Sequence, residues 1–263
     1  MYFLIEKFGL FNGWLLTAAA IFIRYALFAG LAYLLFYIIK RKAFSKARIQ
    51  RTYPGKPNIL SEIRHSFYTA FVFALIGVGL YFLREAGYTR IYTDISTFGW
   101  IYLLFSFLLL VFLHDTYFYW VHRLMHHRKL FRIFHRVHHL SHNPTPWASL
   151  SFHPLEAVAE IAVIPLAAFV IPLHPLALFL LAAWSLVWNV IGHLGYELFP
   201  AGFVHHPVFQ WFNTSTHHNM HHQRSGCNYG LYFNFWDTWM GTNHPEYRQA
   251  FDEIKRREQA YDF

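Results

Sequence analysis

Cysteine and charged residues are scarce in this chain of 263 residues. Cys227 is the single cysteine, which excludes a disulfide framework, an iron–sulfur cluster held by the chain's own thiolates, and a zinc site with several thiolates. Charged residues make up 14% of the chain, against about 25% in soluble proteins. Hydrophobic residues make up 56% and aromatic residues 21%. This composition indicates an integral membrane protein of one or at most two domains.

Long apolar stretches occur in both halves of the chain, and several can span the roughly 30 Å of hydrocarbon in a bilayer. They cover residues 26–39 (with an extension back to about residue 14), 67–83, 98–121, 158–171 and 176–191. The last two flank a Pro-Leu-His-Pro segment, so we expect them to form a helical hairpin. The sequence therefore predicts an all-α integral membrane protein with four to five membrane-embedded helices.

Basic residues in the loops predict the orientation, because loops rich in Lys and Arg stay in the cytoplasm. Between the second and third stretches there are only Arg84 and Arg90. Between the first and second there are Lys40, Arg41, Lys42, Lys46, Arg48, Arg51, Lys56 and Arg64. The second set makes that loop cytoplasmic, and the later spans then place every histidine-rich segment on the same side. We expect a cytoplasmic histidine-rich helical cap, in a bacterial inner membrane or the endoplasmic reticulum. These basic residues also explain the net charge of +8, so a membrane and not a nucleic acid is the expected partner.

Histidine is abundant and unevenly distributed. All nineteen histidines follow Leu60, and most lie in two windows, at residues 114–153 and 193–222. The spacing H-x-x-H-H occurs at 135–139 and at 218–222, and H-x-x-x-H-H occurs at 122–127. Positions i, i+3 and i+4 share one face of a helix, so each box presents two or three imidazoles to a common point. Imidazole binds Zn, Cu, Fe and Ni. Three such boxes supply more ligands than one ion takes, which predicts a dimetal centre.

Other interpretations of the histidines are less favoured. Exposed histidine tracts are polar and low in complexity, whereas these boxes are interleaved with aromatic residues such as Trp120, Phe134 and Phe152. The isolated His65 and His174 are expected to be ordinary packed residues. Structural zinc sites usually include cysteine, and no carboxylate of the kind that bridges hydrolytic zinc ions lies inside a box. Haem would need only two axial histidines. A non-catalytic membrane metal-binding or transport protein is the alternative, although a transporter would carry ionisable residues along its spans.

Residues around the boxes add more specific patterns. They are D-x-x-x-Y-x-x-H-R at 115–123, H-R-V-H-H at 135–139, H-P-L-E at 153–156, G-H-L-G-Y-E at 192–197, H-H-N-M-H-H at 217–222 and W-D-T-W-M-G-T at 236–242. Together they resemble the fatty acid hydroxylase and sterol desaturase superfamily of integral membrane di-iron oxygenases, over about half of the chain. The resemblance implies residues 1–112 as N-terminal membrane helices, 113–244 as the catalytic domain and 245–263 as a cytoplasmic tail.

The resemblance also implies a reaction and a ligand set. The expected centre holds two non-haem iron ions and uses O₂ to hydroxylate or desaturate a C–H bond of a sterol-like or fatty acyl lipid. Electrons would come from an external NAD(P)H-linked reductase, since the chain has no dinucleotide-binding motif. The implied metal ligands and catalytic residues are His122, His126, His135, His138, His139, His193, His218, His221 and His222. His127 is an alternative to His126, and His217 competes with His218.

Other residues are expected to orient the metal-bound histidines, because such histidines usually donate their second N–H to a carboxylate or carbonyl. The expected acceptors are Asp115, Glu156, Glu197 and Asp237. The auxiliary histidines are expected to be His114, His142 and His153.

Overall fold

The computed structural model describes residues 1–259. Within that range the chain is helical and has no β-strand, only isolated bridges, so the predicted all-α fold is confirmed. The α-helices are α1 (Tyr2–Phe8), α2 (Leu10–Tyr33), α3 (Lys56–Glu85), α4 (Gly99–Met125), α5 (Phe131–Phe134), α6 (Pro154–Ile161), α7 (Val163–Val170), α8 (Pro175–Gly192), α9 (Ser215–Arg224), α10 (Phe235–Trp239) and α11 (Tyr247–Gln259). A π-helix (η1, Leu34–Ile39) continues α2, and short 3₁₀-helices are η2 (Ile95–Thr97), η3 (His138–Leu140), η4 (Pro146–Leu150), η5 (Phe203–His205) and η6 (Phe209–Trp211).

Four helices of the described chain are long and apolar enough to cross a membrane: α2 with η1, then α3, α4 and α8. Their outer surfaces carry large apolar side chains, such as Ile101 at 87% exposure and Leu31 at 64%. Such surfaces are unfavourable in water and favourable in lipid. The prediction of four to five membrane-embedded helices is confirmed.

The apolar stretch at 158–171 does not form one long helix. Pro165 lacks an N–H and its ring clashes with the carbonyl of the preceding turn, which separates α6 from α7 near Ala162. The turn after α7 nevertheless reaches the loop between α3 and α4, because Leu173 donates to the Arg90 carbonyl and Tyr92 donates to the Leu173 carbonyl. The expected hairpin therefore consists of the short α6–α7 pair and the single long α8.

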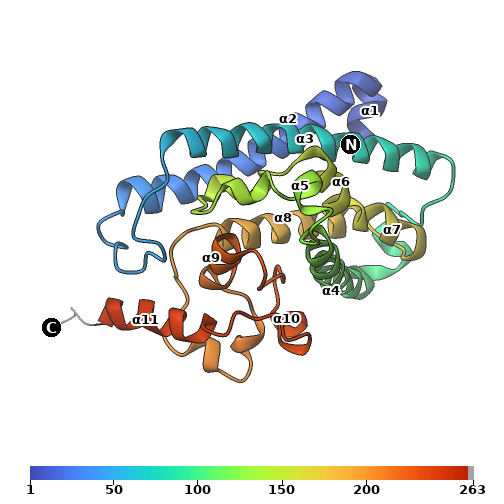
Figure 1. The fold of residues 1–263 in the computed structure, drawn as a ribbon. Helices are drawn as coiled ribbons and strands as arrows, with labels where there is room; N and C mark the ends of the chain where they lie inside the picture. The colour runs from blue at the N-terminus through green and yellow to red at the C-terminus, as the bar shows by residue number, and fades with distance from the viewer. Residues whose placement is uncertain (260–263) are drawn as a thin grey trace.

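The long helices support a cap built from the C-terminal third of the chain. Helix α3 packs along α2, while α8 contacts both α2 and α4. Helices α9, α10 and α11 gather on one side of α8 (Figure 1). Helix α11 packs against α9 and buries Tyr247, Phe251 and Ile254. The segment predicted as a C-terminal tail thus contains a docked helix, and its residues 260–263 lie outside the described part.

Candidate metal centre

Nine of the ten histidines predicted as metal ligands come together in two adjoining groups that can each hold a metal ion. The five-histidine group consists of His122, His126, His135, His139 and His221. The four-histidine group consists of His138, His193, His218 and His222. The ligand nitrogens of each group lie within 4.8 Å of one another.

Local structure explains how each box divides between the two groups. His122 and His126, one turn apart at the end of α4, enter the five-histidine group. On α9, His218 and His222 enter the four-histidine group, whereas His221 points to the other. Each box thus presents two imidazoles to a common point, as expected, but His221 does not share a metal group with His218 and His222. In each box an i, i+4 pair stays together, and in the boxes at 135–139 and 218–222 the remaining histidine joins the neighbouring group.

The box at 135–139 lies on less regular backbone than expected. Helix α5 ends at Phe134, and a 3₁₀-helix begins at His138. His135 and His139 still face the five-histidine group, while His138 turns to the four-histidine group. The box at 218–222 lies on α9, and a cap fixes where this helix begins: the Thr214 hydroxyl accepts from the backbone N–H of His217 at 3.2 Å.

Second ring nitrogens fix the direction of most imidazoles. The Nδ1–H of His122 donates to the Tyr229 carbonyl at 2.8 Å. The other Nδ1 contacts are His138 to the Ser151 carbonyl at 3.3 Å, His193 to the Asn189 carbonyl at 2.7 Å, His221 to the Cys227 carbonyl at 2.7 Å and His135 to the Glu156 carboxylate at 2.5 Å. A carbonyl can only accept, so Nδ1 carries the proton and a neutral ring turns the lone pair of Nε2 inward.

These inward lone pairs test whether a metal fits. The Nε2 atoms of His122 and His135 lie 2.9 Å apart, and those of His138 and His193 lie 3.3 Å apart. Two lone pairs facing each other at this distance repel unless a cation lies between them. Two nitrogens bound at about 2.1 Å to one ion and at a right angle are about 3.0 Å apart. The all-nitrogen donor set and its spacing therefore suit a metal ion in each group.

Burial keeps the imidazoles neutral, as metal binding requires. It lowers the pKa of both His193 and His221 to about 4. Burial first, and neighbouring imidazoles second, hold the pKa well below its ordinary value for His135, His138, His139, His218 and His222. Protons therefore compete weakly with a metal at neutral pH.

Several predicted residues lie elsewhere. His127 is exposed, and its ring accepts from the backbone N–H of Lys129, so it joins neither group. His217 is buried but contacts Asn243, with Nε2 to Oδ1 at 3.2 Å. His142 is exposed, and His153 caps the N-terminus of α6. None of these four histidines belongs to either group. The isolated His174 likewise caps α8.

Of the four predicted carboxylate acceptors, only Glu156 hydrogen-bonds to a grouped histidine. Burial raises the pKa of its carboxyl well above the ordinary value, so the ionised form needs a nearby positive charge, which a bound metal would supply. Asp237 instead accepts from the backbone N–H groups of Tyr229 and Gly230 at 2.9 and 2.7 Å, which orders the turn whose carbonyl holds His122. The remaining two, Asp115 and Glu197, also accept from backbone N–H groups.

Sequence reasoning missed the backbone carbonyls of Ser151, Asn189, Cys227 and Tyr229 as partners of the histidines. Every residue has a carbonyl, so residue type gives no signal for this role.

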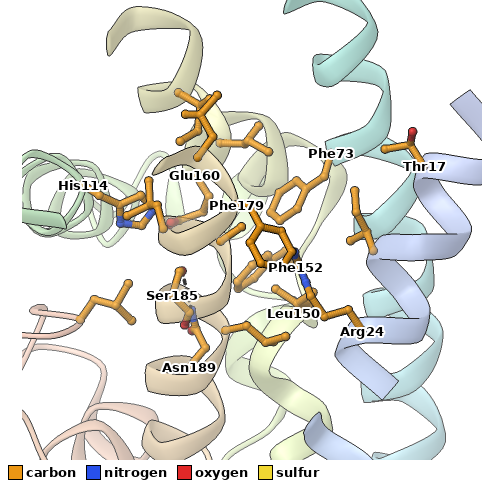
Figure 2. Close-up of a pocket in the computed structure, with 18 of the residues that line it drawn as sticks. Thr17, Arg24, Phe73, His114, Leu150, Phe152, Glu160, Phe179, Ser185 and Asn189 are labelled. Atoms are coloured by element: carbon orange, nitrogen blue, oxygen red, sulfur yellow. Dashed lines mark hydrogen bonds between the residues drawn. The ribbon is translucent and has the colours of Figure 1, made fainter. Parts of the chain in front are cut away.

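A largely apolar cavity of about 380 Å³ lies between α2, α3, α4, α6 and α8. Figure 2 shows His114 on one side of the cavity and Arg24 on the other, with Phe152 between them and Asn189 at the lower part. The Phe152 ring lies 5.3 Å from the His138 ring, centroid to centroid, and the Asn189 carbonyl holds His193. The cavity therefore adjoins the four-histidine group. The predicted auxiliary residue His114 lines this cavity and does not enter either group.

Comparisons with known proteins agree with this site. A family model described as Fatty acid hydroxylase matches residues 107–242, which include both histidine groups. The chain belongs to the fatty acid hydroxylase and sterol desaturase superfamily.

Among curated proteins, lathosterol oxidase of Rattus norvegicus is 37% identical over 172 residues, covering 64% of this chain and 56% of that protein. The Delta(7)-sterol 5(6)-desaturase of Gibberella zeae is 28% identical over 203 residues, covering 76% of this chain and 61% of that protein. Lathosterol oxidase of Homo sapiens is 29% identical over 229 residues, covering 85% of this chain and 71% of that protein. The chain thus spans about six tenths of the length of the first two relatives. No solved structure gives a significant match.

Proposed function

We propose that this protein is a membrane-bound, non-haem di-iron oxidoreductase that uses O₂ to hydroxylate or desaturate a C–H bond of a lipid. One observation carries the proposal: nine neutral imidazoles form two adjoining groups, and one group lies at an apolar cavity between membrane helices. Iron bound there would supply the activation of O₂. Imidazole donors without thiolates or bridging carboxylates favour redox-active iron over structural zinc.

The chain's own residues would hold and orient the reactants. Carbonyl partners of His122, His138, His193 and His221 keep the lone pair of each Nε2 directed inward. Glu156 stabilises positive charge at the five-histidine group through His135. The apolar wall of the cavity would exclude water from the reacting C–H bond.

A sterol-like or fatty acyl lipid is the proposed substrate class. The cavity volume of about 380 Å³ and its mainly apolar lining suit a lipid of this kind. The names of the relatives, lathosterol oxidase and sterol desaturase, favour a sterol-like molecule.

The proposal also includes an orientation and an electron source. The many basic residues at 40–51 support a cytoplasmic location for the histidine cap. Electrons would come from a separate NAD(P)H-linked reductase, docking beside the five-histidine group. The exposed Arg128, Lys129, Arg132 and Arg136 lie in the segment between two histidine boxes and would attract an acidic partner.

The deciding experiment compares the lipids of cells producing the wild-type protein with those of cells producing His193→Ala. An oxidised lipid found only with the wild-type protein supports the proposal. Metal analysis that finds only zinc in natively produced protein, together with no O₂ consumption by the reduced protein in any lipid extract, would favour the non-catalytic alternative. Accessibility labelling of Ala43→Cys and Gln223→Cys, in a Cys227→Ser background, tests the orientation. Both sites must react from the same side.

A further inference from the structure

A continuous row of aromatic rings connects the five-histidine group to the protein surface. The Tyr229 ring centroid lies 5.2 Å from that of His126 and 6.2 Å from that of Tyr119. Tyr119 stacks on Trp236 at 5.8 Å, and Trp236 lies 5.6 Å from Trp239. Trp239 is 63% exposed. We call Tyr229, Tyr119, Trp236 and Trp239 the aromatic row.

The phenol of Tyr119 has a directed route for its proton. Its oxygen lies 2.9 Å from the Thr242 hydroxyl, which donates to the buried Asp237 carboxylate at 2.7 Å. Because the Thr242 proton is already used toward Asp237, Thr242 accepts from Tyr119. Arg123 donates to the Tyr119 oxygen at 3.2 Å, which leaves the phenolic O–H free to point at Thr242.

This arrangement suits one-electron transfer. Tryptophan and tyrosine lose an electron more readily than other aromatic side chains, and tyrosine does so most easily when its proton can leave at the same time. Trp236 also contacts the exposed Trp120 at 5.5 Å. The Arg123 guanidinium lies 5.9 Å from the Trp120 ring, and a positive radical is disfavoured beside a cation. The path through Trp239 is therefore the favoured exit.

We propose that the aromatic row is a one-electron path that carries oxidising equivalents away from the metal centre when no lipid is in the cavity. One electron passes from Tyr119 through Tyr229 to the oxidised metal centre. The Tyr119 proton moves to Thr242, whose own proton moves to Asp237. A one-electron reductant at the surface then returns an electron through Trp239 and Trp236, and the protons move back. The histidine ligands are thereby protected from oxidation.

The role of the metal centre as the oxidant rests on the proposed function. The test therefore supplies a different oxidant. A ruthenium polypyridyl photosensitiser is attached at Met240→Cys, beside Trp239, in a Cys227→Ser background. The protein is loaded with redox-inert zinc, and no O₂ or lipid is added. After a flash with an oxidative quencher, electron paramagnetic resonance records any tyrosyl radical. Failure here removes the electron path and leaves the oxygenase proposal intact.

We expect a neutral tyrosyl radical in the parent protein. Tyr119→Phe lowers its yield by an order of magnitude or more, and Thr242→Val lowers it because the proton acceptor is gone. Trp236→Phe keeps an aromatic ring in place but slows radical formation, also by an order of magnitude or more. Trp100→Phe, which removes an exposed tryptophan outside the row, changes nothing.

An unchanged radical yield in Tyr119→Phe, or an unchanged rate in Trp236→Phe, would overturn the proposal. The zinc content of each variant reports whether the histidine groups are still assembled. If Trp236→Phe loses zinc, Trp239→Phe at the exposed end of the row decides, because its loss must slow radical formation without disturbing the core.

Discussion

The two histidine groups use the same side chain in different surroundings. In the four-histidine group every member is buried, and Phe152 and Asn189 connect it to the lipid-sized cavity. In the five-histidine group His126 is only half-buried, Glu156 contacts His135, and the aromatic row leads to the surface. The comparison suggests a division of roles. Under the proposed function, a metal in the four-histidine group would face the substrate, and a metal in the five-histidine group would face the supply of charge and electrons.

Removal of a central histidine should have the largest effect. The Nε2 of His193 lies within 3.3 Å of the Nε2 atoms of three other histidines in the four-histidine group. His193→Ala should therefore abolish lipid oxidation and remove one metal ion. His221→Ala should do the same at the five-histidine group. Both variants should still insert into membranes, since the spans are unchanged. Loss of both metals from His193→Ala would show that the groups are not independent sites, and retention of both would show that His193 is not an essential ligand.

The adjacent pair His217 and His218 sharpens the comparison. His218 lies in the four-histidine group, whereas His217 bonds to Asn243. His218→Ala should lose one metal and all activity. His217→Ala, the matched control, should keep at least part of its metal and activity. Metal analysis of the two purified variants that gave the reverse order would mean that the ligand assignment at α9 is wrong.

Glu156 should matter to the five-histidine group alone. Glu156→Gln keeps the shape but removes the negative charge that His135 contacts. Loss of such a partner typically costs about 10- to 100-fold in metal affinity or activity. Competition with a chelator should show weaker binding of one metal and unchanged binding of the other. Equal weakening of both would contradict separate surroundings for the two groups.

Acid should destabilise the fold, with a smaller and gradual effect. Free histidine titrates near pH 6.5, whereas burial lowers the pKa of His193 and His221 to about 4. Between these values the unfolded chain binds more protons than the folded chain, so folding is disfavoured as the pH falls. The melting temperature should be constant above about pH 6.5 and fall steadily toward pH 4. A melting temperature that rises on acidification would contradict neutral buried imidazoles.

Spacing was sufficient to predict which pairs of histidines come together, because an i, i+4 pair on a helix shares a face whatever surrounds it. His122 with His126 and His218 with His222 followed that rule. Spacing could not predict the division between groups. His221 joins the other group because the second group lies on the neighbouring side of α9, which depends on how the helices pack.

The long helices could be predicted from composition. Features that depend on single residues were harder to predict. Apolar length identified α2, α3, α4 and α8. The break between α6 and α7 at Pro165 was missed, although a proline inside an apolar run is a known signal. The roles of Asp115, Glu197 and Asp237 also differed from expectation, because carboxylates satisfy buried backbone N–H groups as readily as imidazole N–H groups.

The central claim is that each histidine group holds one metal ion, and the metal content of natively produced protein tests it most directly. The account predicts two iron ions per chain in the wild-type protein. It predicts one in His193→Ala, with the remaining ion in the five-histidine group, and one in His126→Ala, with the remaining ion in the four-histidine group. A single ion in the wild-type protein would contradict a dimetal centre. Two ions in both His193→Ala and His126→Ala would contradict it as well.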